Sequence, residues 1–324
     1  MSFTSLNGNL NIAVTNNIAG LRAQIEARSE EATTGLQSDM ITHLNGRIDQ
    51  ALVGEQALRD NADEQSRLGL RTVRLSLVDS ALTSVRALSE GLHINMLSAI
   101  GTGEIEAQDL VATEAENALD DVISRLSARN GERFLFSGDA TATRPFADTS
   151  VLLDDLRAIA AGAVDEADFA AQVEVYFDDP AGGFQTNFYQ GSQSASDPDS
   201  VVANQPEFKD LIQGLALLTL SRSGAGVPFA QGGTPAMDQA LERLERGRTN
   251  IVNTQASVGM RRESIADEQL LLQREQTLLN QAYTDLVGKD QFEAAAQLRE
   301  LEANLEASYL LTTRLSNLSL INFL

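Results

Sequence analysis

The chain has 324 residues, enough for two or three domains, and carries a formal net charge of −22. A charge of this sign makes nucleic acid and anionic membranes poor partners on electrostatic grounds. The absence of cysteine excludes disulfides and thiolate metal sites, and it is compatible with an extracellular protein that needs neither.

The start of the chain gives no sign of a cleaved export signal. Residues 1–14 have neither a basic region nor a continuous apolar core, so we expect no secretory signal peptide. No stretch approaches about 20 consecutive apolar residues, so we expect no membrane insertion. If the protein leaves the cell, we expect a route that uses no cleaved signal.

Two residue classes divide the chain into a centre and two flanks. All six prolines lie between Pro145 and Pro235, and most of the aromatic residues lie in the same window. The flanks are rich in helix formers and contain no proline. This division predicts two helical arms, one from each end of the chain, that enclose an inserted domain.

The first predicted helix covers residues 6–34. Ile18, Leu21 and Ile25 share one face, and Gly35 follows the pattern as a plausible C-cap. We interpret this apolar face as an assembly interface. A surface helix of a globular domain is the simpler alternative.

A long second helix is predicted over residues 48–100, and a third over residues 104–129. The second helix carries a stripe whose residues are spaced by seven: Leu68, Leu75, Leu82, Ser89 and Met96. The glycines at 101 and 103 end this helix. Together with the long helix near the C-terminus, these segments predict an antiparallel helical rod.

The helical period stops after Gly131. Residues 133–138 alternate between apolar and polar and end at Gly138, which predicts a short strand. Residues 147–234 are acidic and mixed in pattern, and we predict an exposed inserted α/β domain there. We also expect this domain to be dispensable for the rod, because antiparallel arms would bring its two ends close together.

Within this insert the pattern predicts three helices and two strands. The helices are expected at residues 152–161, 168–175 and 207–221. The strands are expected at residues 175–177 and 184–189.

The strongest periodicity lies in residues 237–286. Apolar residues recur at every seventh position, without exception: Met237, Leu244, Ile251, Val258, Ile265, Leu272, Leu279 and Leu286. This pattern predicts one continuous helix about 75 Å long, with an apolar seam that a partner helix must cover. The parallel seam four residues on is mostly polar, from Arg248 to Tyr283, and could fix register or meet another subunit.

The last predicted helix covers residues 289–324. Its apolar face provides further assembly candidates: Leu298, Leu301, Leu305, Tyr309, Leu315 and Leu318. Apolar residues this close to a chain end are unusual for a soluble monomer. We therefore expect the first and last helices to be disordered in the free monomer and to fold on assembly.

The residues show no catalytic constellation, so we expect no enzyme, no cofactor and no metal site. His43 and His93 are the only histidines, and neither has partners suggested by spacing. The glycine pairs at 224–226 and 232–233 lack the strand, helix and lysine of a phosphate-binding loop. The acidic pairs at 178–179 and 197–199 lack the ligand spacing of a calcium loop.

Several of these motifs resemble the bacterial flagellin superfamily, and within it the hook-associated protein 3 branch. The main signal is the stretch from Asn130 to Phe146, with these motif residues: Gly131, Phe134, Phe136, Gly138, Pro145 and Phe146. Thr33-Thr34-Gly35-Leu36 resembles the turn after the first helix of that superfamily, and residues 306–309 and 318–320 resemble the branch's last helix. Residues 37–46 depart from it, because they contain one Asp where the family usually has an Asp-Asp pair.

The resemblance implies a non-enzymatic assembly protein of the flagellum, located outside the cell. It implies type III export in an unfolded state with the help of a chaperone. It further implies a ring of identical subunits that joins the hook to the filament, with hook-associated protein 1 and flagellin as neighbours. Flagellin itself, and a coiled-coil structural or adaptor protein, remain alternatives.

The predicted organisation has three parts. Residues 1–45 and 289–324 form a terminal-helix assembly domain. Residues 46–146 and 235–288 form a helical rod domain, and residues 147–234 form the inserted exposed domain.

Overall fold

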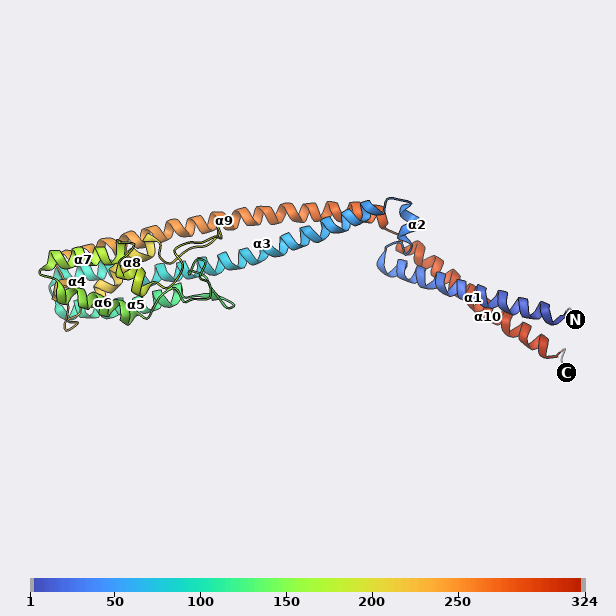
Figure 1. Ribbon diagram of the computed structural model, residues 1–324, viewed down its shortest axis with the longest axis horizontal. Coiled ribbons are helices and arrows are strands. Elements are labelled where there is room, and N and C mark those ends of the chain that lie inside the picture. Colours follow the sequence, from blue (N-terminus) through green and yellow to red (C-terminus); the bar gives the residue numbers. More distant parts are fainter. Residues whose placement is uncertain (1–2, 322–324) are drawn as a thin grey trace. The chain divides into compact units, whose positions relative to one another are not determined.

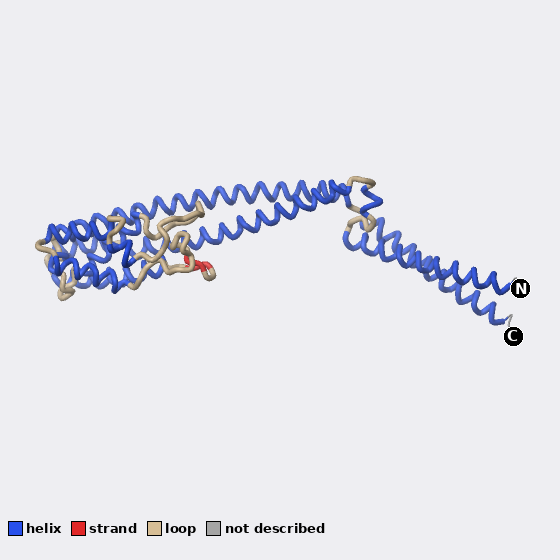
Figure 2. The backbone as a smooth tube through the Cα atoms, viewed as in Figure 1, coloured by secondary structure: helices blue, strands red, loops and turns tan. Residues whose placement is uncertain are grey.

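A computed structural model of the chain confirms the mainly helical fold class. It describes the backbone of residues 3–321 and the side chains of residues 15–314. Long helices dominate (Figure 1), and the one sheet of the described residues is a hairpin of two short strands (Figure 2). Within the described residues, no helix is both long and apolar enough to cross a membrane.

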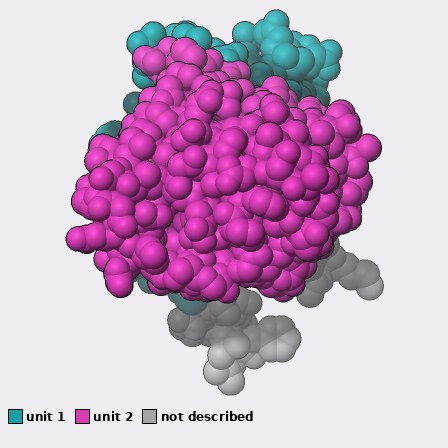
Figure 3. All heavy atoms as spheres, turned by 90° about the vertical axis from the view of Figure 1, so that its left-hand side faces the viewer, with its two compact units in different colours: residues 1–66, 270–324 teal, residues 67–269 magenta. Residues whose placement is uncertain are grey.

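The chain forms two compact units, which Figure 3 colours separately. The terminal unit consists of Met1–Ser66 and Leu270–Leu324, and the central unit of Arg67–Gln269. The central unit therefore holds both the greater part of the predicted rod and all of residues 147–234.

The terminal unit is built from two pairs of segments. The first pair is α1 (Phe3–Thr34) and α10 (Gln291–Ile321), which pack side by side along their lengths (Figure 1). The second pair is the N-terminal part of α3 (Ile48–Ser89) and the C-terminal part of α9 (Pro235–Val287). The short helix α2 (Met40–Leu44) lies in the connection between α1 and α3.

The central unit is a bundle around the remaining parts of α3 and α9. Its other helices follow in chain order: α4 (Leu92–Thr102), α5 (Ile105–Leu126), α6 (Thr149–Gly162), α7 (Glu166–Asp178), the π-helix η1 (Phe184–Phe188), α8 (Pro206–Leu220) and the 3-10 helix η2 (Pro228–Ala230). Its two strands are β1 (Arg129–Asn130) and β2 (Arg133–Phe134), which pair antiparallel. The predicted strand at 133–138 is thus formed over its first two residues.

In the central unit the sevenfold stripes of α3 and α9 are buried. Leu68, Leu75, Leu82, Ser89 and Met96 are all at most 1% exposed. The five stripe residues of α9 are at most 2% exposed: Met237, Leu244, Ile251, Val258 and Ile265. Polar side chains beside the stripes join the helices: Gln255 Nε2 donates to Thr83 Oγ1 at 2.9 Å, and Arg262 Nη1 to Asp79 Oδ2 at 2.9 Å. The polar seam of α9 therefore sets the antiparallel register against α3 within one chain.

The predicted helix over residues 48–100 is interrupted once, between α3 and α4. Gly91 has a φ of +84°, a left-handed conformation that favours glycine, and it ends the run of helical hydrogen bonds. The helix starts again at Leu92, and Leu92, Met96 and Ala99 are buried like the stripe before them. The interruption therefore leaves the apolar seam continuous.

Residues 147–234 are not an exposed insert as a whole, because α8 belongs to the core. Every residue from Asp210 to Leu220 is buried. Two glycines allow α8 and α9 to approach closely. A Cβ at Gly214 would lie 2.8 Å from the carbonyl oxygen of Ala240, and one at Gly247 would lie 2.7 Å from the amide nitrogen of Leu211.

The two strands predicted at 175–177 and 184–189 are helical instead. Residues 175–177 continue α7, because Phe169, Val173, Tyr176 and Phe177 bury one helical face and this outweighs the local alternation. Residues 184–188 form a π-helix, closed by the amide of Tyr189, which donates to the carbonyl of Phe184 at 2.7 Å. The expected α/β character of residues 147–234 is therefore wrong.

Candidate assembly surface

The predicted terminal interface residues lie on α1 and α10. Their side chains are half-buried or, for Tyr309, 39% exposed: Ile18, Leu21, Ile25, Leu298, Leu301, Leu305 and Tyr309. Leu315 and Leu318 lie outside the residues whose side chains are described. Because α1 and α10 pack against one another, part of each apolar face is covered by the other helix within one chain.

One polar contact joins the two terminal helices. Arg22 donates from Nε and Nη2 to the Tyr309 hydroxyl, at 3.1 and 2.6 Å, and its guanidinium lies 5.9 Å from the centre of the tyrosine ring. Both side chains are exposed to solvent. The contact fixes the register of α10 against α1 but adds little stability in water.

Many large apolar side chains of the terminal unit face solvent. Those that exceed one third exposure are Ile41, Ile48, Leu52, Val53, Leu270, Leu271, Leu278, Phe292, Tyr309, Leu310 and Leu311. The buried apolar side chains among its described residues number only four: Leu44, Ala51, Val287 and Ala294. A surface of this kind is typical of protein–protein contacts.

Sequence reasoning singled out few of these exposed residues. The run of three leucines at 270–272 was the available signal, because one heptad stripe can bury only Leu272. Leu271 and Leu278 are seven residues apart and 62% and 71% exposed, so they form a second stripe on α9 that the chain itself leaves open.

Two glycine turns connect the terminal helix pair to α3 and α9. Gly35, with a φ of +71°, and Gly288 lie in segments that pair: Gln37 N donates to Val287 O at 2.9 Å, and Lys289 N to Gly35 O at 2.8 Å. A small apolar cluster supports the turns: Leu44, Ala51 and Val287, with Leu36, Met40, Tyr283 and Leu286 packed on it. The two turns therefore form one joint.

A buried carboxylate holds the first turn of this joint. Glu31 is 2% exposed and accepts from the amide of Ser38 at 3.2 Å and from its hydroxyl at 2.9 Å, and it also pairs with Arg28. Burial alone would raise the pKa of Glu31, but the hydrogen bonds from Ser38 and Arg28 hold it below its usual value. In the connector that departs from the family pattern, Asp39 caps α2 by accepting from the amide of Thr42 at 3.1 Å.

The predicted rod seam changes character along α9. Leu244, Ile251, Val258 and Ile265 are at most 2% exposed in the central unit. In the terminal unit, Leu272, Leu279 and Leu286 are half-buried. There α3 contributes the polar residue Asn61 at the stripe position, and its Nδ2 donates to the carbonyl of Leu272 at 3.1 Å.

The residues of the family motif belong to the interior of the central unit. Phe136 and Phe146 are fully buried: Phe136 packs edge-on against Phe208, and Phe146 stacks on Phe188 with ring centres 5.2 Å apart. Pro145 is buried next to Phe146, and Phe134 is half-buried at the hairpin. These positions shape the fold rather than form an exposed interface.

The glycines of the motif adopt left-handed conformations. Gly131 turns the hairpin with a φ of +62°, and Gly138 has a φ of +59°. A Cβ at Gly138 would lie 2.5 Å from the carbonyl oxygen of Ser194. Both glycines are therefore required by the backbone.

The strongest electrostatic cluster of the central unit lies between α7, α8 and α9. Arg243 is 8% exposed; its Nη1 donates to Asp210 at 2.9 Å, and its Nη2 to Asp178 at 2.5 Å. The hydrogen bond from Arg243 lowers the pKa of Asp178, whereas burial raises the pKa of Asp210 against the pull of Arg246 and Arg243. The cluster ties three helices together.

Neither histidine is hydrogen-bonded or ion-paired to an acidic side chain among the described residues. The pKa of Glu245 is lowered mainly by the hydrogen bond from Arg248, and His93 lies near enough to add to this effect. His43 Nε2 lies 3.3 Å from the carbonyl oxygen of Leu286, at the joint between the turns. His93 is half-buried on α4. Among the described residues, no three His, Asp or Glu side chains come together in a way that could hold a metal ion.

Comparison with known proteins gives a likeness of fold. No model of a known protein family matches the sequence, and no curated protein matches it. The crystal structure of FlgL from Bacillus cereus is similar, with a TM-score of 0.51 and 13% identity over 72% of this chain and 99% of that one. A flagellar hook-associated protein from Vibrio parahaemolyticus has a TM-score of 0.48 and 15% identity, over 73% of this chain and 95% of that one.

Proposed function

We propose that this chain is a structural protein of the bacterial flagellum, without enzymatic activity, that joins the hook to the filament as a ring of identical subunits. The observation that carries the proposal is the terminal unit. Helices from both ends of the chain are paired there, yet the described side chains leave Leu271, Leu278 and Phe292 open to solvent. Neighbouring subunits would cover such a surface.

The fold likeness supports a flagellar role. The Bacillus cereus protein is aligned over 99% of its length, so the likeness concerns its whole architecture rather than one helix pair. The motif residues from Gly131 to Phe146 agree with it, since they are buried or conformationally required, as a shared fold demands.

The proposed partners follow from this role. Hook-associated protein 1 lies on one side of the ring and flagellin on the other, and the ring contacts are made by copies of this chain. The subunit reaches its site outside the cell by type III export in an unfolded state, accompanied by a chaperone. The absence of cysteine suits this route, because refolding then needs no disulfide formation.

Electron microscopy of cells that lack this protein tests the proposal. We expect hooks without filaments and flagellin released into the medium, both restored by the intact gene. Normal filaments on the mutant cells would contradict the proposal.

Flagellin is the main competing assignment, and polymerisation distinguishes it. Purified flagellin extends a filament seed by itself, whereas a junction protein does not. Seeded growth of long filaments from this chain alone would therefore replace the proposed role with that of a filament subunit. A coiled-coil adaptor unrelated to flagella would leave the mutant cells with normal hooks and filaments.

A further inference from the structure

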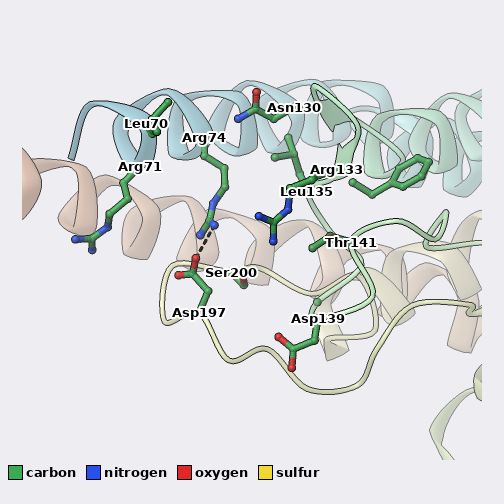
Figure 4. Close-up of a pocket in the computed structure, with 12 residues that line it drawn as sticks. Leu70, Arg71, Arg74, Asn130, Arg133, Leu135, Asp139, Thr141, Asp197 and Ser200 are labelled. Atoms are coloured by element: carbon green, nitrogen blue, oxygen red, sulfur yellow. Dashed lines mark hydrogen bonds and ion pairs between the residues drawn. The ribbon is translucent and has the colours of Figure 1, made fainter. Parts of the chain in front are cut away.

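A pocket in the central unit lies apart from the terminal assembly surface. Its volume is about 310 Å³, and its walls come from α3, the β1–β2 hairpin with the loop behind it, and the segment 197–200. Figure 4 shows that the guanidinium group of Arg74 from α3 points toward Asp197, and that Arg133 from the hairpin extends into the same pocket. Asp197 already pairs with Arg74, whereas Arg133 has no ion-pair partner among the described residues.

The carboxylate groups in and beside the wall already accept hydrogen bonds from other groups of the protein. Asp197 accepts from Arg74 Nη1 at 2.5 Å and from the amide of Asp199 at 2.8 Å. Asp139 accepts from the amide and the hydroxyl of Ser196, at 2.7 and 3.1 Å. Asp199, beside the pocket, accepts from Arg71 Nε at 2.7 Å.

Several donors, in contrast, have no acceptor among the described residues. Arg74 Nη2 is buried and unpaired, and buried donors of this kind normally have a partner. The Arg133 guanidinium and the hydroxyls of Thr141 and Ser200 likewise make no hydrogen bond or ion pair with the described side chains. The pocket therefore has unpaired donors, although the charges of its three arginines are balanced by Asp139 and Asp197 in the wall and by Asp199 beside it.

We infer that this pocket binds a carboxylate group between Arg74 and Arg133. Guanidinium groups bind the planar carboxylate through paired N–H donors, and the hydroxyls of Thr141 and Ser200 offer further donors. Leu70, 69% exposed, and Phe134 also line the pocket. These apolar side chains suit the methylene groups that a carboxylic acid carries and that inorganic phosphate lacks.

The carboxylate has two possible sources with the same chemistry. It is either a free small carboxylic acid or an Asp or Glu side chain of a second copy of this chain. Neither source depends on the proposed flagellar role, so the inference and that role can fail separately.

Propionate, which has the structure of a glutamate side chain, is the probe. In nuclear magnetic resonance spectra of the full-length protein, we expect propionate to shift the amide signals of residues 129–141 in a saturable way. Propionamide, its neutral analogue, should leave them unchanged at equal ionic strength. R133Q should weaken propionate binding at least about tenfold, because one of two guanidinium partners is lost.

R133Q is expected to leave the fold intact, because the Arg133 side chain is exposed and makes no hydrogen bond or ion pair with the described residues. Unfolding midpoints of the wild type and R133Q should therefore agree. Sedimentation of both proteins identifies the source: a self-association that R133Q and propionate both weaken assigns the site to a second copy, and its absence assigns it to a free acid. Equal propionate binding by R133Q, or neither saturable binding nor an association that depends on Arg133, would overturn the inference.

Discussion

The two units of this protein are made of similar helices but bury them very differently. In the central unit the apolar stripes close on one another, and Leu75, Leu215 and Ile251 are fully buried. In the terminal unit, Leu278 is 71% and Phe292 90% exposed. Stability of a helix in a protein comes mainly from packing of its apolar face. The difference therefore separates a region whose apolar stripes are covered within the chain from one whose apolar side chains remain largely exposed.

The largest expected effect concerns residues 147–234. We now expect their replacement by a short Gly/Ser linker to abolish the cooperative unfolding of the central unit, because α8 would be lost from its core. Each buried leucine of α8 contributes about 1.5 to 3 kcal/mol, and a domain's total stability is about 5 to 15 kcal/mol. Circular dichroism during heating measures this. If the replacement leaves a sharp unfolding transition, residues 147–234 are dispensable for the rod, as the sequence predicts.

A point substitution makes the same test without a large deletion. Leu215→Ala should lower the free energy of unfolding by about 2 to 5 kcal/mol, because Leu215 is fully buried. The matched control is Val164→Ala, at a side chain that is 87% exposed. It should change the stability by no more than about 0.5 kcal/mol.

One heptad stripe allows the two units to be compared within a single helix. Ile265→Asp places an unpaired charge in the buried seam of the central unit and should cost about 3 kcal/mol or more. Leu279→Asp lies on the same stripe, but in the terminal unit, where the side chain is half-buried, and should cost much less. Chemical denaturation measures both. The control is Gln269→Asp, beside the stripe, which should lower the free energy of unfolding by less than about 1 kcal/mol. Similar losses of stability from Ile265→Asp and Gln269→Asp would mean that the buried face is wrongly assigned.

Much of this architecture could be predicted from the sequence. The sevenfold stripes of α3 and α9 predicted both helices and their pairing, because such a stripe must be covered by a partner of similar length. Glycine predicted the helix ends near Gly35 and Gly103. These signals are local or strictly periodic, and so they can be read without knowledge of the fold.

The parts that failed depend on contacts between distant segments. The alternation of Val175, Tyr176 and Phe177 favours a strand, but the face that α7 buries from Phe169 onward decides for a helix. The all-round burial of α8 requires α5 and α9 on either side of it, which its sequence alone does not specify. The pocket at Arg74 and Arg133 joins residues from three separate segments, and the motif in one of them, residues 130–146, does not specify the other two.

A smaller effect concerns the ion cluster that only the central unit contains. The pKa of Asp178 is lowered in the folded state by Arg243, so its stabilisation is present above the unfolded value of about 3.8. It is lost as the pH falls through the folded pKa. The Asp178 side chain is 45% exposed, so solvent screens the pair, and Asp178→Asn should lower the stability at pH 7 by no more than about 1 kcal/mol; the difference from wild type should disappear in acid.

Asp210 should behave in the opposite sense. Burial raises its pKa in the folded state, so the folded protein holds a proton that the unfolded chain has released, and stability falls as the pH rises through this window. Urea unfolding at a series of pH values measures both variants. If the free energies of unfolding of Asp178→Asn and Asp210→Asn depend on pH in the same way, burial does not shift the pKa values of the two carboxylates in opposite directions.

The smallest expected effect on stability comes from removing the ends of the chain. Truncation of residues 1–34 and 289–324 removes α1 and α10, which pack on each other within the terminal unit and carry none of the stripe residues of α3 and α9. The unfolding midpoint of the central unit should shift by less than about 4 °C, which corresponds to about 1 kcal/mol for a domain of this size. A larger drop would show that the terminal helices stabilise the central unit.

Hydrogen exchange on the full-length monomer tests the same difference without a truncation. The sequence predicts that both ends are disordered before assembly, whereas the structure shows α1 and α10 as paired helices. The pair has half-buried faces and an exposed Arg22–Tyr309 contact, so we expect it to open far more readily than α8. Its amides should exchange orders of magnitude faster than those of α8 in the monomer and become protected on assembly, because only neighbours can bury the exposed faces. If the amides of α1 and α10 are as well protected in the monomer as those of α8, the terminal unit is stable without neighbours, and its exposed apolar surface is not needed to fold it.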